Sequence, residues 1–226
     1  MTGSTDKSRN RKLKILKVAQ ELFNSDGFQE TTVDDIMRGV GAAKGAFYYY
    51  FDTKEQVLDC LIDNSINKKV SAVSSVLEKP GMNALQKLQI ILQEEFKTGM
   101  ESYDPKNHVH NIKNVDMHQK IIAGMVERFA PLIGKVVEQG INEGRFRTEY
   151  PLEVSQIVVA GVHFVTDLGI FKWSAEQYLS RIKASEELIE KVLCIQKGSL
   201  SILPGSGKNL VLFNKEVGSN GNTNNE

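Results

Sequence analysis

A chain of 226 residues with 41% hydrophobic and 25% charged residues can bury a sizeable core, in one large domain or two small ones. Its formal net charge is zero, so no overall excess of basic residues indicates a nucleic acid partner. The two cysteines, Cys60 and Cys194, form neither a disulfide framework nor a C-x-x-C site, which favours reduced thiols. The amino terminus lacks an apolar signal segment, and the most apolar stretch, 157–165, is too short to span a bilayer. We therefore expect a cytoplasmic protein with no membrane partner.

The first expected helix runs from about residue 9 to residue 25 and carries a basic run. Its apolar residues recur at helical spacing: Ile15, Val18, Ala19 and Leu22. Gly27 and Phe28 then end the helix, and Phe28 can contact Phe23. Between residues 7 and 20 there are six basic residues and no acidic one: Lys7, Arg9, Arg11, Lys12, Lys14 and Lys17. Such a run is usually a solvated helix face, but it is better explained as an electrostatic footprint for nucleic acid if a DNA-binding motif follows.

The next segment, 31–41, has the pattern of a short capped helix. Thr31 and Thr32 each precede an acidic residue by three positions, which is the capping-box pattern, so either can be the N-cap. The apolar stripe consists of Val33, Ile36, Met37 and Val40. Gly39 and Gly41 supply the positive-φ freedom that a tight helix stop requires.

A second short helix is expected over 42–51, and its side chains sort into two faces. The inward stripe consists of Phe47, Tyr50 and Phe51, and the opposite face consists of Lys44, Gly45, Tyr48 and Tyr49. For these ten residues alone, an ordinary aromatic core helix is the simpler interpretation. The capped helix before them favours a helix-turn-helix whose outer face contacts phosphates and base edges.

A long helix then begins at a capping box, Thr53-x-x-Gln56, and continues to about residue 77. Its apolar stripe consists of Val57, Leu58, Leu61, Ile62, Ile66, Val73 and Leu77. Pro80 and Gly81 end it. The three small helices before it bury little surface, so this helix is expected to pack with them and to belong to both halves of the molecule.

Residues 9–57, above all TTVDDIMRGVGAAKGAFYYYFDTKEQV, closely resemble the amino-terminal domain of the tetracycline-repressor (TetR) family. Ala43 and Ala46 depart from the family pattern, because hydroxyl residues are common at both positions. Without these hydroxyl groups two possible hydrogen bonds to DNA are lost. The departure affects the operator sequence that the protein would recognise, not the fold. The resemblance implies a DNA-binding domain over 9–69, with the motif at 32–51, and an effector-binding and dimerisation domain over 70–197.

The remaining pattern is helical up to residue 197, which predicts an all-α protein. Further helices are expected over 85–99, 105–112, 116–143, 151–171 and 175–197. Pro131 interrupts the long helix, and either a kink or a break is expected there. From residue 198 to residue 226 the chain is rich in Gly, Asn and Ser, which predicts a flexible tail.

The last two helices are expected to form a homodimer. The penultimate helix is apolar nearly all round, which requires cover on more than one side. Burial within one subunit is the alternative, but TetR-like proteins dimerise through these two helices, so the pattern and the resemblance agree. The expected interface residues are Val158, Val162, Val165, Ile182, Ile189, Val192 and Leu193.

A surface of eight residues is expected to contact operator DNA. They are Thr31, Thr32, Lys44, Gly45, Ala46, Tyr48, Tyr49 and Lys54. The lysines and threonines would contact phosphates, the tyrosines would bind phosphates or pack on thymine methyl groups, and the two small residues would let the backbone approach the groove.

An unidentified small-molecule effector is expected in the carboxyl-terminal half. Candidate pocket residues are Phe96, Met100, Tyr103, Met125, Phe129, His163 and Phe164, although such residues at helical spacing are more often plain core. No cofactor and no metal site is expected. The sequence thus predicts a dimeric transcriptional regulator, a ligand-released repressor of a palindromic operator. The alternative is an enzyme or sensor on a helical bundle, but no nucleophile, base and oxyanion donor occur together, so we expect no enzyme.

Overall fold

The computed structural model describes residues 3–101 and 115–203, and every regular element in these two ranges is a helix. In chain order they are α1 (Gly3–Ser25), α2 (Val33–Val40), α3 (Gly45–Tyr48), α4 (Lys54–Leu77), α5 (Ala84–Glu101), α6 (Val115–Gly124), the π-helix η3 (Met125–Phe129), α7 (Ala130–Asn142), α8 (Pro151–Val165) and α9 (Ala175–Val192). The predicted all-α fold class is confirmed. The helix expected over 105–112 lies outside the described residues. None of the described helices is both long and apolar enough to cross a membrane.

The chain divides into two compact units, and α4 supplies residues to both. The amino-terminal unit comprises Met1–Asn67 and Lys106–Ile121, and the carboxyl-terminal unit comprises Lys68–Pro105 and Ile122–Glu226. Because the division falls inside α4, one continuous helix runs from beside α3 into the second unit.

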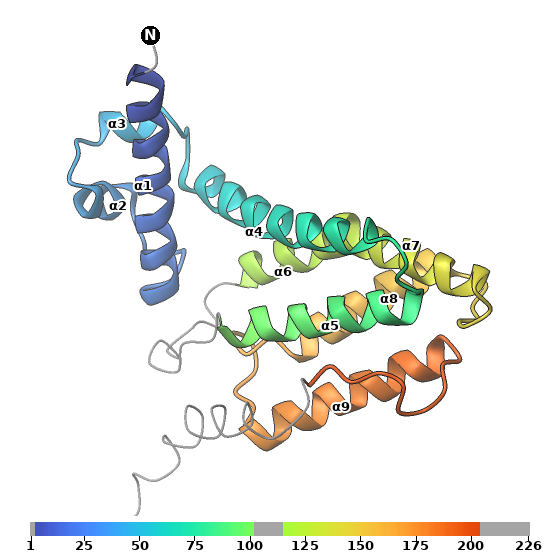
Figure 1. The fold of residues 1–226 in the computed structure, drawn as a ribbon. Coiled ribbons are helices and arrows are strands. Elements are labelled where there is room, and N and C mark those ends of the chain that lie inside the picture. Colours follow the sequence, from blue (N-terminus) through green and yellow to red (C-terminus); the bar gives the residue numbers. More distant parts are fainter. Residues whose placement is uncertain (1–2, 102–114, 204–226) are drawn as a thin grey trace, which may run out of the picture. The chain divides into compact units, whose positions relative to one another are not determined.

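The amino-terminal unit is built on α1, which packs against α2 (Figure 1). Its buried apolar residues come from the helices α1 to α4 and from the segments that join them, and include Ile15, Leu16, Ala19, Phe23, Phe28, Ile36, Met37, Val40, Phe47, Phe51, Val57, Leu58 and Ile62. The rings of Phe23 and Phe28 meet edge to face at 5.1 Å, which confirms the predicted contact at the end of α1. The helix itself starts earlier than expected, at Gly3 rather than near residue 9.

The structure decides which threonine caps α2. The Thr32 hydroxyl accepts a hydrogen bond from Asp35 N at 3.1 Å, and the Asp35 carboxylate accepts one from Thr32 N at 3.1 Å. The Thr32 hydroxyl also donates to Asp35 Oδ2 at 2.5 Å, and this hydrogen bond, followed by the one from Thr32 N, lowers the pKa of Asp35. At the other end Gly41 has φ 71°, as predicted for the stop. Gly39 has a different role from the one expected, because a Cβ there would lie 2.6 Å from Val18 Cγ1. Its lack of a side chain lets α2 approach α1.

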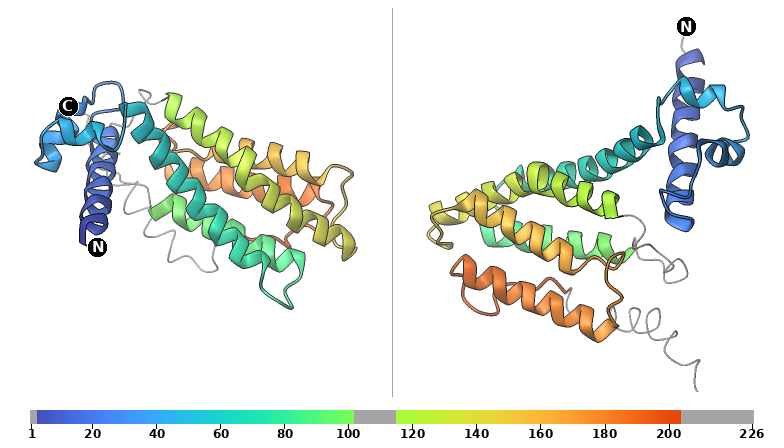
Figure 2. Two further views of the ribbon diagram at one scale, coloured as in Figure 1. Left: turned by 90° about the horizontal axis from the view of Figure 1, so that it is seen from above. Right: turned by 180° about the vertical axis from the view of Figure 1, so that it is seen from behind.

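The carboxyl-terminal unit is a layered bundle in which α7 packs against both α5 and α8, and α8 packs against α9 (Figure 2). A buried lysine fixes one end of the bundle. Lys87 Nζ donates to Leu77 O at 2.7 Å and to Gln139 Oε1 at 3.0 Å, so it joins α5 to the end of α4 and to α7. Satisfying the ammonium in this way offsets the cost of burying it.

Pro131 produces neither a sharp break nor a plain kink. The helix continues through the π-helical turn η3, and Ala130 N donates to Met125 O, five residues back. A proline ring clashes with the carbonyl four residues earlier and has no N–H to donate. Widening the turn before Pro131 removes this conflict and keeps the helix continuous from α6 to α7.

The helices at the carboxyl end are shorter than predicted, and part of the expected tail is ordered. α8 ends at Val165 rather than near residue 171, and α9 ends at Val192 rather than near residue 197. Leu200 and Ile202 are buried, and Leu200 N and Ile202 N donate to Glu190 Oε1 and Glu186 Oε1. This corrects the prediction of a flexible tail starting at residue 198. Two glutamates one helical turn apart on α9 accept hydrogen bonds from backbone N–H groups of 198–203. The composition of this segment gave no indication of these bonds.

Candidate nucleic-acid interface

Helix α3 has the two faces that its sequence predicts. Phe47 and Phe51 are 0% and 4% exposed, whereas Tyr48 and Tyr49 are 52% and 75% exposed. Tyr50 is only half-buried, and its ring meets that of Tyr49 edge to face at 4.8 Å. The regular part of the helix is confined to Gly45–Tyr48, less than the ten residues expected. Two buried phenylalanines thus hold two exposed tyrosines in place.

Lys44 lies on the exposed side, at the start of α3, but it is already paired. Its Nζ lies 2.9 Å from Asp34 Oδ2 in the first turn of α2, and this pairing raises the pKa of Lys44. Both side chains remain more than half exposed. No helical periodicity relates residues on two different helices, so the pair was not foreseen. A phosphate that binds Lys44 has to compete with this carboxylate.

Two of the residues expected to contact phosphates have structural roles within the subunit. Thr31 is buried, and its hydroxyl donates to Gly27 O at 2.7 Å. Lys54 Nζ donates to Phe28 O, Gln29 O and Thr31 O at 2.8, 3.0 and 3.0 Å. These three bonds use all three donors of the ammonium. Thr31 and Lys54 therefore hold the loop between α1 and α2, and their contact with phosphates stays a prediction.

The remaining expected contacts lie on the exposed surface. Thr32 is exposed, but its hydroxyl is used by the capping box of α2. A Cβ at Gly45 would meet no atom within 4 Å, so this backbone faces open space. Ala46 is half-buried beside it. The structure thus groups α3 and its flanking residues, Lys44, Gly45, Ala46, Tyr48 and Tyr49, as one candidate surface, with Thr32 at the start of α2.

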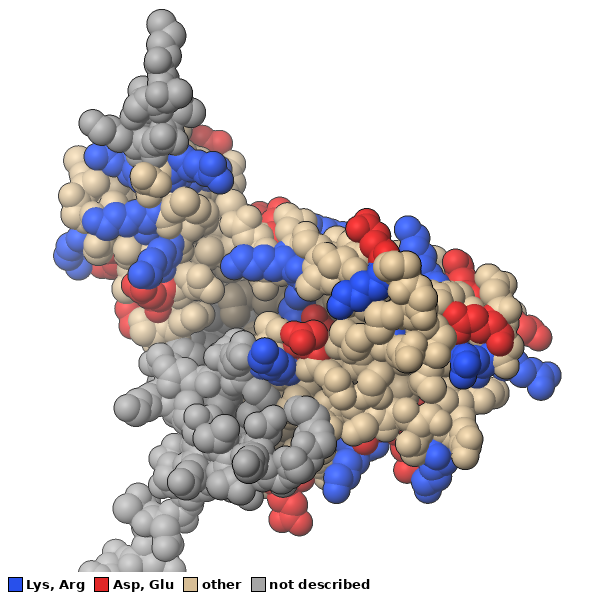
Figure 3. Space-filling model, in the orientation of Figure 1, with Lys and Arg blue, Asp and Glu red and all other residues tan. Residues whose placement is uncertain are grey.

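The basic run of α1 contributes to one face of the amino-terminal unit that is rich in Lys and Arg. On the face shown in Figure 3, Lys and Arg side chains predominate over Asp and Glu in this unit. Lys14 Nζ donates to Val40 O at 2.8 Å, Lys12 Nζ lies 5.2 Å from the centre of the Phe51 ring, and Lys17 pairs with Glu21 at 4.0 Å. By contrast, Arg9 and Arg11 are exposed and form no ion pair or hydrogen bond with the described residues.

The candidate effector residues do not share one environment. Phe96 packs with Tyr178, Ile182 and Trp173 between α5 and α9. Met125 and Phe129 are buried in the π-helical turn. The ring of Phe164 instead meets that of Phe171 at 5.2 Å, and His163 beside it is half-buried. The side chain of Met100 and the whole of Tyr103 lie outside the described part of the chain.

The expected dimer residues divide into buried and accessible ones. Ile182, Ile189 and Leu193 are buried within the single subunit, which corrects their assignment to the interface. Val158, Val162 and Val192 are half-buried, and Val165 is 37% exposed. Three exposed large apolar residues were not among the expected interface residues: Ile157 at 72%, Phe164 at 43% and Leu188 at 48% exposed. Ile157, Phe164 and Val165 follow helical spacing, so they form one stripe on α8.

The fold and the exposed α3 face define a helix-turn-helix DNA-binding protein with a second helical unit, and comparisons with known proteins agree. Residues 15–61 match the family described as bacterial regulatory proteins, tetR family, and residues 100–188 match the tetracyclin repressor-like C-terminal domain. The chain belongs to the TetR family of transcriptional regulators.

The relatives and solved structures are similar to this chain to different extents. EthR of Mycobacterium tuberculosis is 35% identical over 71 residues, so the chain matches about a third of that relative (31% of this chain, 33% of EthR). KstR2, a transcriptional repressor of Rhodococcus jostii, is 21% identical over 154 residues, which cover 67% of this chain and 75% of KstR2. Reduced NemR of E. coli has a TM-score of 0.62 at 13% identity, covering 83% of this chain and 99% of NemR. FadR of Bacillus subtilis, in complex with stearoyl-CoA, has a TM-score of 0.57 at 18% identity, covering 80% of this chain and 97% of FadR. These two structures share the fold.

Proposed function

We propose that this protein is a cytoplasmic repressor that binds a palindromic operator as a homodimer and releases it when a small molecule binds. The observation that carries the proposal is the α3 surface, where Lys44, Tyr48 and Tyr49 are exposed while Phe47 and Phe51 anchor the same helix in the core. Each tyrosine meets one neighbouring ring edge to face, and the exposed part of its side chain remains available to a partner. Phenols and an ammonium suit phosphates and thymine methyl groups.

The homodimer is supported by the apolar stripe of α8. Ile157, Phe164 and Val165 expose apolar area on the same face, and Leu188 does so on α9. A contiguous apolar face of this kind is stabilised by burial against a partner. An identical chain offers the same face, and a two-fold arrangement matches the symmetry of a palindromic site.

The effector is proposed to be an apolar molecule that binds the carboxyl-terminal unit. The cluster of Phe96, Tyr178, Trp173 and Ile182 offers aromatic and aliphatic contacts there. Within it Tyr178 is buried, which raises the pKa of its hydroxyl to about 12.

The test of DNA binding starts with selection of genomic fragments by the purified protein, followed by footprinting. Tyr49→Ala should then weaken binding to the selected fragment at least tenfold, because it removes an exposed contact that has no part in the core. Tyr150→Ala is the matched control, since Tyr150 is 61% exposed but lies in the carboxyl-terminal unit. Equal affinities for the two variants, or no selected fragment at all, would refute the assignment of the α3 surface.

A further inference from the structure

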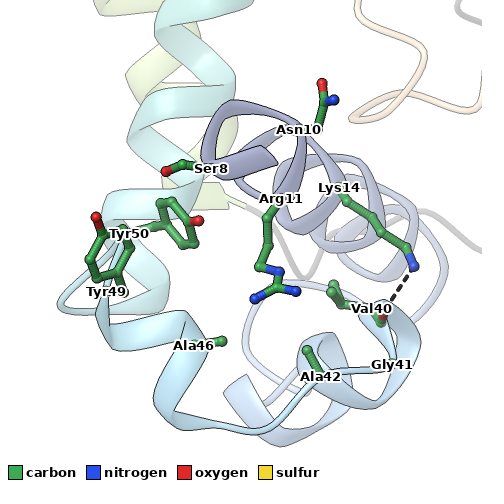
Figure 4. A pocket seen from close by; sticks show the side chains of 10 residues that line it. All are labelled: Ser8, Asn10, Arg11, Lys14, Val40, Gly41, Ala42, Ala46, Tyr49 and Tyr50. Atoms are coloured by element: carbon green, nitrogen blue, oxygen red, sulfur yellow. Dashed lines mark hydrogen bonds between the residues drawn. The ribbon is translucent and has the colours of Figure 1, made fainter. Parts of the chain in front are cut away.

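An open hollow lies in the amino-terminal unit, between α1 and the turn that joins α2 to α3 (Figure 4). It is lined by Ser8, Asn10, Arg11, Lys14, Val40, Gly41, Ala42, Ala46, Tyr49 and Tyr50. The polar side chains of this lining are all hydrogen-bond donors, and none of these ten residues is acidic. The hollow is therefore suited to an anion rather than to a cation or an apolar group.

Arg11 is the cation available to an occupant of this hollow. In Figure 4 its side chain points from α1 into the space between Ala42 and Ala46. Lys14, on the same wall, already donates to Val40 O at 2.8 Å. Arg11 forms no ion pair or hydrogen bond with the described residues, so its guanidinium keeps all its donors for a ligand.

We propose that the hollow receives a phosphate group of the operator backbone, held by the Arg11 guanidinium with the hydroxyl groups of Tyr49 and Tyr50 beside it. The inference rests on the proposed DNA-binding function and adds a contact from α1 to it. Ala46 and Tyr49 belong both to the hollow and to the α3 surface, so a strand that passes α3 reaches the hollow. A guanidinium can bind two phosphate oxygens at once through parallel hydrogen bonds.

The contact assigns a specific role to one member of the basic run. A phosphate contact fixes the position of a protein on the duplex without reading sequence. Ala42 and Ala46 offer no hydroxyl, so the lining there cannot donate to the phosphate, and Arg11 supplies the missing donors. The small size of the two alanines also leaves the space that the phosphate needs.

The test compares Arg11→Ala with Arg9→Ala, which removes the same charge from a neighbouring exposed position outside the lining. Affinity for the selected duplex and for a scrambled duplex is measured across about 50–200 mM salt. Arg11→Ala should weaken binding to both duplexes alike. It should reduce the slope of log affinity against log salt by about 0.9 for each lost contact, which corresponds to about eightfold in affinity per contact at 0.1 M salt relative to 1 M. Arg9→Ala should leave the slope nearly unchanged. Arg11→Lys should keep the slope but bind more weakly, because an ammonium cannot make the paired hydrogen bonds.

Three results would overturn the inference. Equal effects of Arg9→Ala and Arg11→Ala would show a diffuse basic field, and a wild-type slope for Arg11→Ala would show that the hollow contacts no phosphate. An NMR titration of the Arg11 Nε–H signal separates DNA from a free anion. The duplex should shift this signal, and inorganic phosphate at matched ionic strength should not. Saturation by inorganic phosphate would assign the hollow to a free anion instead. If the wild type bound no duplex, the proposed function itself would fail, which is a distinct outcome.

Discussion

Lys44 Nζ lies 2.9 Å from Asp34 Oδ2, so the basic residue at the start of α3 is paired with the first turn of α2. The carboxylate belongs to the same surface that DNA would cover. If Lys44 contacts a phosphate as proposed, binding exchanges its carboxylate partner for that phosphate and brings Asp34 close to the negatively charged backbone. We therefore expect the pair to limit affinity for DNA of any sequence.

Asp34→Asn should therefore tighten binding. An exposed ion pair contributes about 0–1 kcal/mol, so the expected gain in DNA affinity is about two- to fivefold at low salt and smaller at high salt. Affinity should rise for operator and scrambled duplexes alike, as measured by fluorescence anisotropy. Weaker binding with relaxed preference at one base pair would show instead that Asp34 reads a cytosine.

Lys54→Ala should lower stability rather than change the salt dependence of DNA binding. The ammonium donates to three carbonyls of the loop between α1 and α2, and the variant leaves these without a donor. The expected loss is about 1–3 kcal/mol in the free energy of unfolding, measured by urea denaturation. Lys79→Ala, at an exposed position after α4, is the control and should be neutral. A reduced salt slope in folded Lys54→Ala would return this residue to the phosphate contacts.

Ile157→Asp should convert the dimer into a monomer without unfolding the subunit. Ile157 is 72% exposed in the single chain, so a charge there costs little until a partner covers it. Sedimentation of the wild type should give about twice the chain mass of 25.2 kDa, and the variant should give the chain mass itself. Leu13→Asp tests an apolar residue that is 54% exposed on α1 and should remain dimeric. A wild-type monomer, or an unchanged dimer in Ile157→Asp, would contradict the proposed interface.

Leu61→Ala should weaken the coupling between effector and operator more than it weakens operator binding alone. Leu61 is half-buried on the part of α4 that belongs to the amino-terminal unit, and the same helix continues into the carboxyl-terminal unit. We expect the coupling to be about 1–3 kcal/mol, or 5- to 150-fold in operator affinity. Operator affinity is measured with and without saturating effector, for the wild type and the variant. An unchanged ratio in a stably folded variant would show that this packing does not carry the signal.

Local patterns in the sequence were sufficient to predict much of the amino-terminal unit. The Thr32 capping box, the Gly41 stop and the division of α3 into a buried Phe47 face and an exposed Tyr49 face depend on residues within a few positions of each other. Such neighbours are placed by helical periodicity and by turn chemistry alone. For this reason the fold class and the exposed α3 surface could be read from the sequence.

The tertiary structure decided the matters that depend on distant residues. The sequence contains Lys54 and Thr31 at positions suited to phosphates, but only the folded loop brings three carbonyls to Lys54 Nζ. Likewise, helical periodicity marks Ile182 as apolar without saying whether its own subunit or a partner covers it. Glu190 accepts hydrogen bonds from the backbone of a segment whose composition suggested disorder. Lys54 meets its acceptors 23 to 26 residues away, and Glu190 meets its donors 8 to 10 residues away in a segment beyond the end of its own helix.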